Sequence, residues 1–158
     1  MTIATDTGSA YESAMPQKVL VTGATGLVGR AVCQTLRTQG HNVCAGVRNP
    51  KAKAAIALGQ CGIPIVSTPD LASTDSPWPL SGVDVVVHAA ARVHIMKPDA
   101  GDAERFMAVN RDGTERLARQ CAAQGVKRLV FLSSIKVNGE ATAPGCAFTA
   151  QDTPHPVD

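Results

Sequence analysis

A glycine-rich turn near the start of the chain has the spacing of a phosphate-binding loop. Its three glycines stand in the run TGATGLVG at 22–29, directly after an apolar segment and before one with helical spacing. Gly23 permits a tight turn, Gly26 lets the backbone approach a pyrophosphate, and Gly29 allows close packing of a helix on a sheet. The first amides of that helix and its dipole favour a phosphate group. The turn therefore predicts contacts with a dinucleotide from Gly23, Thr25, Gly26, Leu27, Val28 and Gly29.

The residue after the second apolar segment, 42–47, bears on the choice of dinucleotide. NAD is recognised by a carboxylate about 20 positions beyond the glycine-rich turn, which accepts hydrogen bonds from the ribose 2′-OH. Here the position is occupied by Arg48, followed by Asn49. A guanidinium pairs well with the 2′-phosphate of NADP, although an ordinary surface arginine is the alternative. We expect NADP(H) to be favoured over NAD(H). Further along, Asp70 and Leu71 are predicted cofactor contacts, with the carboxylate of Asp70 near the adenine amino group.

Strand-like and helix-like patterns alternate along the chain. Apolar runs predict strands over 18–22, 42–47, 63–67, 83–89 and 128–134. Helical spacing predicts helices over 26–39, 50–58 and 102–124. The stripe of the first helix consists of Val28, Ala31, Val32, Thr35 and Leu36, and Pro50 is expected near the first turn of the second. This α/β alternation predicts a Rossmann-type doubly wound parallel sheet, truncated after about five strands.

The composition is that of a globular chain. Hydrophobic residues make up 44% of the 158 residues and charged residues 18%, with a net charge of +2. A disordered chain would be poorer in apolar residues, and a nucleic-acid binder would be more basic. The five cysteines form no C-x-x-C pair, so we expect neither a disulfide framework nor a metal site, and a reducing, cytoplasmic location. The start of the chain lacks the features of a signal peptide, and the apolar run at 83–91 is interrupted by Asp84 and His88 and too short for a bilayer.

Four motifs, in order, resemble the extended short-chain dehydrogenase/reductases, also called the NAD-dependent epimerase/dehydratase family. They are the turn TGATGLVG, the run VDVVVHAAA at 83–91, the segment VNRDGT at 109–114 and the run GVKRLVFLSS at 125–134. The resemblance extends from about residue 18 to residue 158. The runs AAARVH at 89–94 and SIKVNG at 134–139 look like bacterial UDP-sugar 4-epimerases and 4-ketoreductases. The resemblance implies NAD(P) as cofactor and a nucleotide sugar as substrate.

The resemblance also implies roles for residues after the fourth and fifth strands. Ser134 corresponds to the family's catalytic Ser/Thr, whose hydroxyl would bond the sugar oxygen at the carbon that gains or loses a hydride. Asn110 resembles the family asparagine near the centre of the sheet, or is a polar group satisfied at a helix start. The implied cofactor contacts are Ala89, Ala90, Ala91, Asn110 and Ser133, and the candidate substrate contacts are Arg92, His94 and Lys136. His88, inside a strand, is expected to pack in the core.

The family's proton-transfer pair, Tyr-x-x-x-Lys, has no match in this sequence. The single tyrosine is Tyr11, and Met15 stands where the lysine would be. Residues 148–158 look like the stretch that precedes the pair, so we expect the chain to stop short of its catalytic base. Dehydratases carry an Asp–Glu pair where this chain has Ile135 and Lys136. Because elimination of water needs such an acid and base, a dehydratase is disfavoured.

Two functions follow from this reading. The first is the NAD(P)-binding part of a nucleotide-sugar epimerase or 4-ketoreductase, inactive alone, whose full-length parent transfers a hydride at the carbon of a UDP-linked sugar; family members commonly form homodimers. The second is a non-catalytic dinucleotide-binding or sensing module. Nucleic acid and membrane partners are expected in neither. We divide the chain into a flexible lead-in at 1–16 and a Rossmann domain at 17–158 that lacks its C-terminal substrate-binding part, with a fifth strand whose exposed edge predicts poor solubility.

Overall fold

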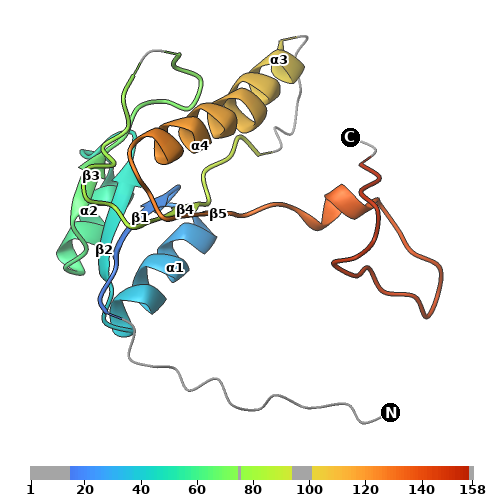
Figure 1. Cartoon of the computed structure of the whole chain (residues 1–158), viewed down its shortest axis with the longest axis horizontal. Coiled ribbons are helices and arrows are strands. Elements are labelled where there is room, and N and C mark those ends of the chain that lie inside the picture. The colour runs from blue at the N-terminus through green and yellow to red at the C-terminus, as the bar shows by residue number, and fades with distance from the viewer. Residues whose placement is uncertain (1–14, 75, 94–100, 157–158) are drawn as a thin grey trace.

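Five parallel strands form one sheet in the order β3-β2-β1-β4-β5 (Figure 1). The structure, a computed structural model, describes residues 15–74, 76–93 and 101–156. The strands are β1 (Lys18–Thr22), β2 (Asn42–Val47), β3 (Ile65–Ser67), β4 (Val85–His88) and β5 (Arg128–Phe131). The strand order reverses direction beside β1, which is the mark of a doubly wound sheet. The predicted fold class is therefore confirmed.

The central strands are apolar over most of their length because helices cover both faces of the sheet. All four residues of β4 are buried, and so are four of the five in β1. A parallel strand buried on both faces reads as a continuous Val/Leu run rather than an alternating one. Val21 of β1 pairs with Ala45 of β2 on one side and with Val87 of β4 on the other.

Helices α1 (Leu27–Thr38) and α2 (Lys53–Gln60) cover one face of the sheet. The opposite face is covered by a continuous helix made of α3 (Asp102–Phe106), η1 (Met107–Asp112) and α4 (Gly113–Ala123). Figure 1 shows the α3–α4 helix above the sheet and α1 below it. The helix predicted over 102–124 thus exists, but its middle, η1, is π-helical. A π-helical turn holds more residues than an α-helical turn and shifts the side chains that follow it.

Two hydrophobic clusters lie on the two faces of the sheet. Cys33 of α1 and Leu58 of α2 pack against the β-strand residues that face them, such as Val21. Leu117 and Cys121 of α4 belong to the second cluster, in which they are grouped with Leu20 of β1 and Val86 of β4. Of the three cysteines that stand within apolar segments of the sequence, Cys33 and Cys121 are buried and Cys44 is half-buried. Burial raises the pKa of Cys33 to about 11, so its thiol stays protonated.

The first two helices differ in detail from the prediction. The inward face of α1 carries Gly29 and Cys33, while Ala31 and Thr35 of the predicted stripe are exposed. Val32 and Leu36 of the stripe pack against the core as predicted, whereas Val28 is exposed and lines the cavity described below. Pro50 lies outside α2: Asn49 accepts hydrogen bonds from the amides of Lys51 and Ala52 in a turn that delays the helix to residue 53.

Strand β5 forms one edge of the sheet and ends earlier than predicted, at residue 131 rather than 134. Its last ladder bond runs from the Leu132 amide to the His88 carbonyl, 3.1 Å, after which β4 offers no further partner. Val130 and Phe131 are 40% and 52% exposed. Beyond β5, the short helix η2 (Ile135–Asn138) and the residues up to 156 extend away from the sheet (Figure 1).

Two further expectations from the sequence concern the lead-in at 1–16 and the absence of a membrane-spanning helix. Most of the lead-in predicted at 1–16 lies outside the described residues. Within the described part, no helix has the length and apolar character needed to cross a membrane.

Candidate dinucleotide-binding site

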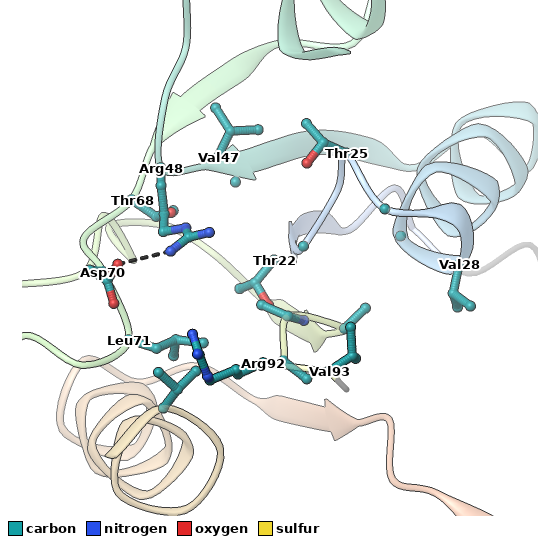
Figure 2. A pocket seen from close by; sticks show the side chains of 18 of the residues that line it. Thr22, Thr25, Val28, Val47, Arg48, Thr68, Asp70, Leu71, Arg92 and Val93 are labelled. Carbon is teal, nitrogen blue, oxygen red and sulfur yellow. Dashed lines mark hydrogen bonds and ion pairs between the residues drawn. The ribbon is translucent and has the colours of Figure 1, made fainter. Parts of the chain in front are cut away.

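A cavity of about 570 Å³ opens at the carboxyl ends of β1, β2, β3 and β4. Four segments converge on it, as Figure 2 shows: the turn and helix start at 22–29, the β2 end at 46–48, residues 68–71 after β3, and residues 89–93 after β4. The reversal of strand order lies between β1 and β4, in the middle of these segments. Open α/β sheets bind their ligands at this place, so the fold puts the cavity where a dinucleotide would be expected.

The N-terminus of α1 lies at the cavity and has neither a side-chain cap nor an acidic residue in its first turn. The Gly26 amide donates to the Gly23 carbonyl at 2.9 Å, which closes the turn, and α1 begins at Leu27. No side chain caps Gly26, and the first turn of α1 has no acidic residue. The amides at a helix N-terminus and the positive end of its dipole favour an anion. This helix start is therefore suited to a phosphate group of a ligand.

The glycines of the turn are required by close backbone approach. Gly23 has φ +65°, and a Cβ placed on it would lie 2.7 Å from the carbonyl carbon of Ala89 and from the amide nitrogen of Ala90. A Cβ on Gly29 would overlap the carbonyl oxygen of Gly23. The turn after β1 and the segment after β4 thus touch through backbone, which leaves the space in front of them for a ligand.

A buried hydrogen-bonded network ties together β1, β4 and α4 beside the cavity. Thr22 Oγ1 lies 2.6 Å from His88 Nδ1, and His88 Nε2 lies 3.1 Å from Thr114 Oγ1. Thr22 Oγ1 also accepts from the Ala90 amide at 3.3 Å. A neutral imidazole has one donor and one acceptor nitrogen, and a threonine hydroxyl on each side can partner either one. The network fixes the start of the 89–93 segment.

His88 is a structural residue. Its side chain is fully buried, and its ring stacks on that of Phe131 with 5.9 Å between centroids. Burial lowers the pKa of His88 to about 4, so the ring is neutral at physiological pH. His88 does not line the cavity. The expectation that it packs in the core agrees with this placement.

Asn110 holds the other end of the same segment. Its Oδ1 accepts from the Arg92 amide at 2.7 Å, and its Nδ2 donates to the Arg92 carbonyl at 2.9 Å. Asn110 belongs to η1, where the π-helical turn sets the direction of its side chain. The carboxamide therefore acts as a clamp on the backbone after β4 and does not itself line the cavity.

Arg92 lines the cavity and is held by several groups. Its Nη2 donates to Asp102 Oδ1 at 2.7 Å, and its guanidinium lies 5.5 Å from the centroid of the Phe106 ring. Arg105 shares the buried Asp102 carboxylate at 3.2 Å. The Nε of Arg92 is buried with no hydrogen-bond partner among the described residues. The side chain thus has a fixed orientation at the cavity wall.

Arg48 and Asp70, predicted as separate cofactor contacts, form an ion pair. Arg48 Nη1 lies 2.9 Å from Asp70 Oδ2, drawn as the dashed line in Figure 2. The backbone amide of Ala72 donates to the other oxygen of Asp70 at 2.8 Å. The hydrogen bond from the Ala72 amide is the main cause that holds the pKa of Asp70 below its usual value, and the hydrogen bond from Arg48 is the second. A carboxylate and a guanidinium therefore share one corner of the cavity.

The predicted site residues separate into two groups. The cavity is lined by Gly23, Thr25, Gly26, Leu27, Val28, Gly29, Arg48, Asp70, Leu71, Ala89, Ala90, Ala91 and Arg92. Ser133, Ser134 and Lys136 are exposed and do not line it. Ser134 Oγ accepts from the Lys136 amide at 3.3 Å and caps η2. His94 lies outside the described residues.

Several residues that line the cavity were missed by sequence reasoning. They are Thr22, Gly46, Val47, Thr68, Pro69, Trp78, Val93 and Val109. Thr22 had a signal, because it is a polar residue that directly ends an apolar run, and Thr68 follows Ser67 at the end of another such run. Trp78 had none, since it comes from the irregular stretch between β3 and β4 and is buried against α4.

Comparison with known proteins identifies the family. Residues 19–157 match the NAD dependent epimerase/dehydratase family. The chain belongs to this family. The resemblance inferred from the four sequence motifs is thereby confirmed.

Relatives within the epimerase/dehydratase family are longer than this chain. It is 41% identical over 147 residues to the UDP-glucose 4-epimerase of Vibrio cholerae, and the match covers 91% of the chain and 43% of that enzyme. The chain thus spans about two fifths of the length of the curated relatives it matches.

Two solved structures of similar fold contain NAD. A short-chain dehydrogenase/reductase superfamily protein from Agrobacterium tumefaciens with bound NAD has a TM-score of 0.67 and 33% identity, over 89% of this chain and 40% of that one. MoeE5 in complex with UDP-glucose and NAD has a TM-score of 0.67 and 30% identity, over 88% of this chain and 42% of its own. The epimerase/dehydratase chain described here is thus similar to NAD-containing proteins over most of its length.

Proposed function

We propose that the cavity binds a nicotinamide dinucleotide and that the chain is the cofactor-binding part of an epimerase or 4-ketoreductase acting on nucleotide sugars. The observation that carries this proposal is the uncapped start of α1, which faces a cavity at the reversal of strand order. The similarity to a UDP-glucose 4-epimerase and to MoeE5, whose complex holds UDP-glucose and NAD, supports it.

The cavity residues fit the parts of a dinucleotide. The turn at 23–29 would hold the pyrophosphate, and the corner with Arg48 and Asp70 would hold the adenosine ribose. The small side chains of Ala89, Ala90 and Ala91 leave room for the ligand beside the turn. When bound, the nicotinamide would supply or accept the hydride exchanged with a sugar carbon. Ser133 would contact the cofactor.

The substrate side of the proposal rests on fewer groups of this chain. Ser134 would hold the sugar oxygen by its hydroxyl, and Arg92 would meet an anionic part of a UDP-linked substrate from its fixed position. His94 and Lys136 are further candidates for the substrate. The chain's single tyrosine, Tyr11, is not followed by the lysine that a Tyr-x-x-x-Lys pair needs. We therefore propose that the chain alone binds the dinucleotide and does not turn over a sugar.

We also propose that NADP(H) is favoured over NAD(H). Arg48 supports this preference, because it lines the cavity with its side chain 73% exposed and can reach a 2′-phosphate. Titration of both dinucleotides into the chain tests it. Arg48→Ala should lower the affinity for NADP and leave that for NAD nearly unchanged. Equal wild-type affinities, or no effect of Arg48→Ala, would refute the preference.

The binding function itself is tested with a matched pair of glycine variants. Gly23 and Gly125 both have positive φ, +65° and +75°, so alanine is strained at either position. Only at Gly23 does the added Cβ meet another segment, whereas nothing lies within 4 Å of it at Gly125. Gly23→Ala should abolish dinucleotide binding measured by calorimetry, and Gly125→Ala should retain it. Failure of the wild-type chain to bind either dinucleotide would refute the function.

A further inference from the structure

The ion pair between Arg48 and Asp70 joins the ends of two neighbouring strands. Arg48 directly follows β2, and Asp70 comes three residues after β3. The side chains are 73% and 49% exposed, so both are accessible from the cavity that they line. Because the pair is exposed, its own contribution to stability is small. Its position in the cavity therefore calls for an explanation other than stability.

Asp70 is anchored independently of Arg48. Its Oδ1 accepts from the Ala72 amide at 2.8 Å, and its backbone carbonyl accepts from the Ser73 amide at 3.0 Å. Only Oδ2 is used for Arg48. If the guanidinium turned toward a ligand, the carboxylate would stay where it is and keep its charge.

The two side chains match the two forms of one ligand group. A dinucleotide places its adenosine ribose near the end of the second strand, where an acid binds the 2′-OH of NAD and an arginine accommodates the 2′-phosphate of NADP. In this chain the residue directly after β2 is the arginine, and the acid stands at a different position, three residues after β3. A 2′-phosphate would have to draw Arg48 away from Asp70 and would also be repelled by the fixed carboxylate.

From this arrangement we infer that Asp70 is a specificity-determining residue, which weakens the binding of NADP relative to NAD by holding Arg48 and by repelling the 2′-phosphate. The inference rests on the proposed dinucleotide-binding function. Arg48 by itself favours NADP over NAD, and Asp70 reduces the ratio of the two affinities. Removing the charge of Asp70 should therefore raise the preference for NADP.

The test is the dissociation constant of NADP and of NAD for the wild-type chain and for Asp70→Asn, at one fixed ionic strength. Asparagine keeps an oxygen that can accept from the Ala72 amide, so the turn is preserved. A unit charge removed beside a phosphate corresponds to roughly a tenfold gain in affinity. Asp70→Asn should lower the dissociation constant of NADP by about that factor and change the dissociation constant of NAD by less than about twofold.

Three further variants support the test. In the Arg48→Ala background, Asp70→Asn should raise the affinity for NADP by a smaller factor, because there is no guanidinium for Asp70 to hold away from the phosphate. Glu115→Gln is the control for net charge: Glu115 forms an exposed ion pair with Arg119 on α4, 2.6 Å, and does not line the cavity. It should leave both affinities unchanged. Asp70→Ser serves as a second charge-removing variant should asparagine disturb the fold.

The outcomes distinguish this inference from the function on which it rests. If Asp70 contacts the adenine amino group, Asp70→Asn will weaken NAD and NADP by the same factor, because both carry adenine. That result, or an unchanged ratio of affinities, overturns the inference and leaves dinucleotide binding standing. Absence of binding of either dinucleotide by the wild-type chain overturns both.

Discussion

His88 supports the segment after β4 at the cavity without lining the cavity itself. Its two ring nitrogens connect the hydroxyls of Thr22 and Thr114, and Thr22 in turn holds the Ala90 amide. The ring is buried, and burial disfavours the charged form, so the pKa of His88 lies at about 4. Protonation would put a charge into the core, and acid should therefore destabilise the fold.

We predict that His88 dominates the pH dependence of stability between pH 6.5 and about 4, the ordinary and the folded-state pKa. In this window the unfolded chain binds a proton that the folded chain excludes, so stability falls as the pH falls. The free energy of unfolding should decrease by roughly 3 kcal/mol across the window. Urea denaturation at a series of pH values measures it. The carboxyl of Asp70, with its lowered pKa, titrates below this window.

Two variants check the assignment to His88. His88→Gln cannot titrate, so its stability should be lower at neutral pH but nearly flat between pH 6.5 and 4. His155→Gln removes an exposed histidine and should keep the wild-type slope. An equal slope in His88→Gln and wild type would show that other groups cause the pH dependence.

The element that matters most for the site is the helix from α3 to α4. Its π-helical part, η1, directs the Asn110 carboxamide at both backbone groups of Arg92. The same helix packs its Leu117 and Cys121 against the sheet. One element thus contributes to the core at one end and fixes a cavity segment at the other.

We predict that Asn110→Leu weakens both folding and ligand binding. The change keeps the side-chain size but leaves the Arg92 amide and carbonyl without their partners, which should cost about 1–3 kcal/mol in unfolding free energy. Dinucleotide affinity should fall because the segment at 89–93 loses its attachment. Asn138→Leu is the matched control, because the Asn138 side chain donates to the Thr149 carbonyl beyond β5 and does not line the cavity. Unchanged dinucleotide affinity in Asn110→Leu would contradict this role of the clamp.

Strand β5 presents a different property, an apolar edge. Its Val130 and Phe131 are exposed, and an exposed edge strand pairs readily with other chains. We predict that the chain alone aggregates and that Val130→Lys reduces light scattering on heating while leaving dinucleotide affinity unchanged. Ile56→Lys, an equal change at an exposed site of α2, is the control for added charge. Equal improvement by both variants would show that net charge, and not the edge, is responsible.

At the scale of the whole molecule, the proposed function separates binding from turnover. A dinucleotide present at 100 times its dissociation constant should raise the free energy of unfolding by about 2.7 kcal/mol, seen as an increase in Tm. With UDP-glucose and NADPH, the same sample should show no oxidation of NADPH. Gly23→Ala should show no Tm increase. Protein-dependent oxidation of NADPH would contradict the expected lack of turnover.

The sequence predicted the sheet and the turn better than it predicted the contacts between them. Strands β1, β2 and β4 are buried on both faces, and such strands are visible as apolar runs. The glycine turn was visible because its backbone geometry restricts the residue type. The pairing of Arg48 with Asp70 was not visible, since it depends on the register in which Val47 lies beside Ser67. The π-helical turn likewise has no marker among the residue types of 107–112.

The π-helical segment has a consequence for how the length of this chain can vary. Each residue of a helix turns the chain by about 100°, so a single deletion between Asn110 and Gly113 could restore a regular α-helix without breaking it. Leu117 and Cys121 would still face the sheet, but Asn110 would lose the direction that the π-helical turn gives its side chain toward Arg92. In a set of homologous genes, we therefore expect insertions and deletions to be accepted in the loops and to be rare in residues 107–112.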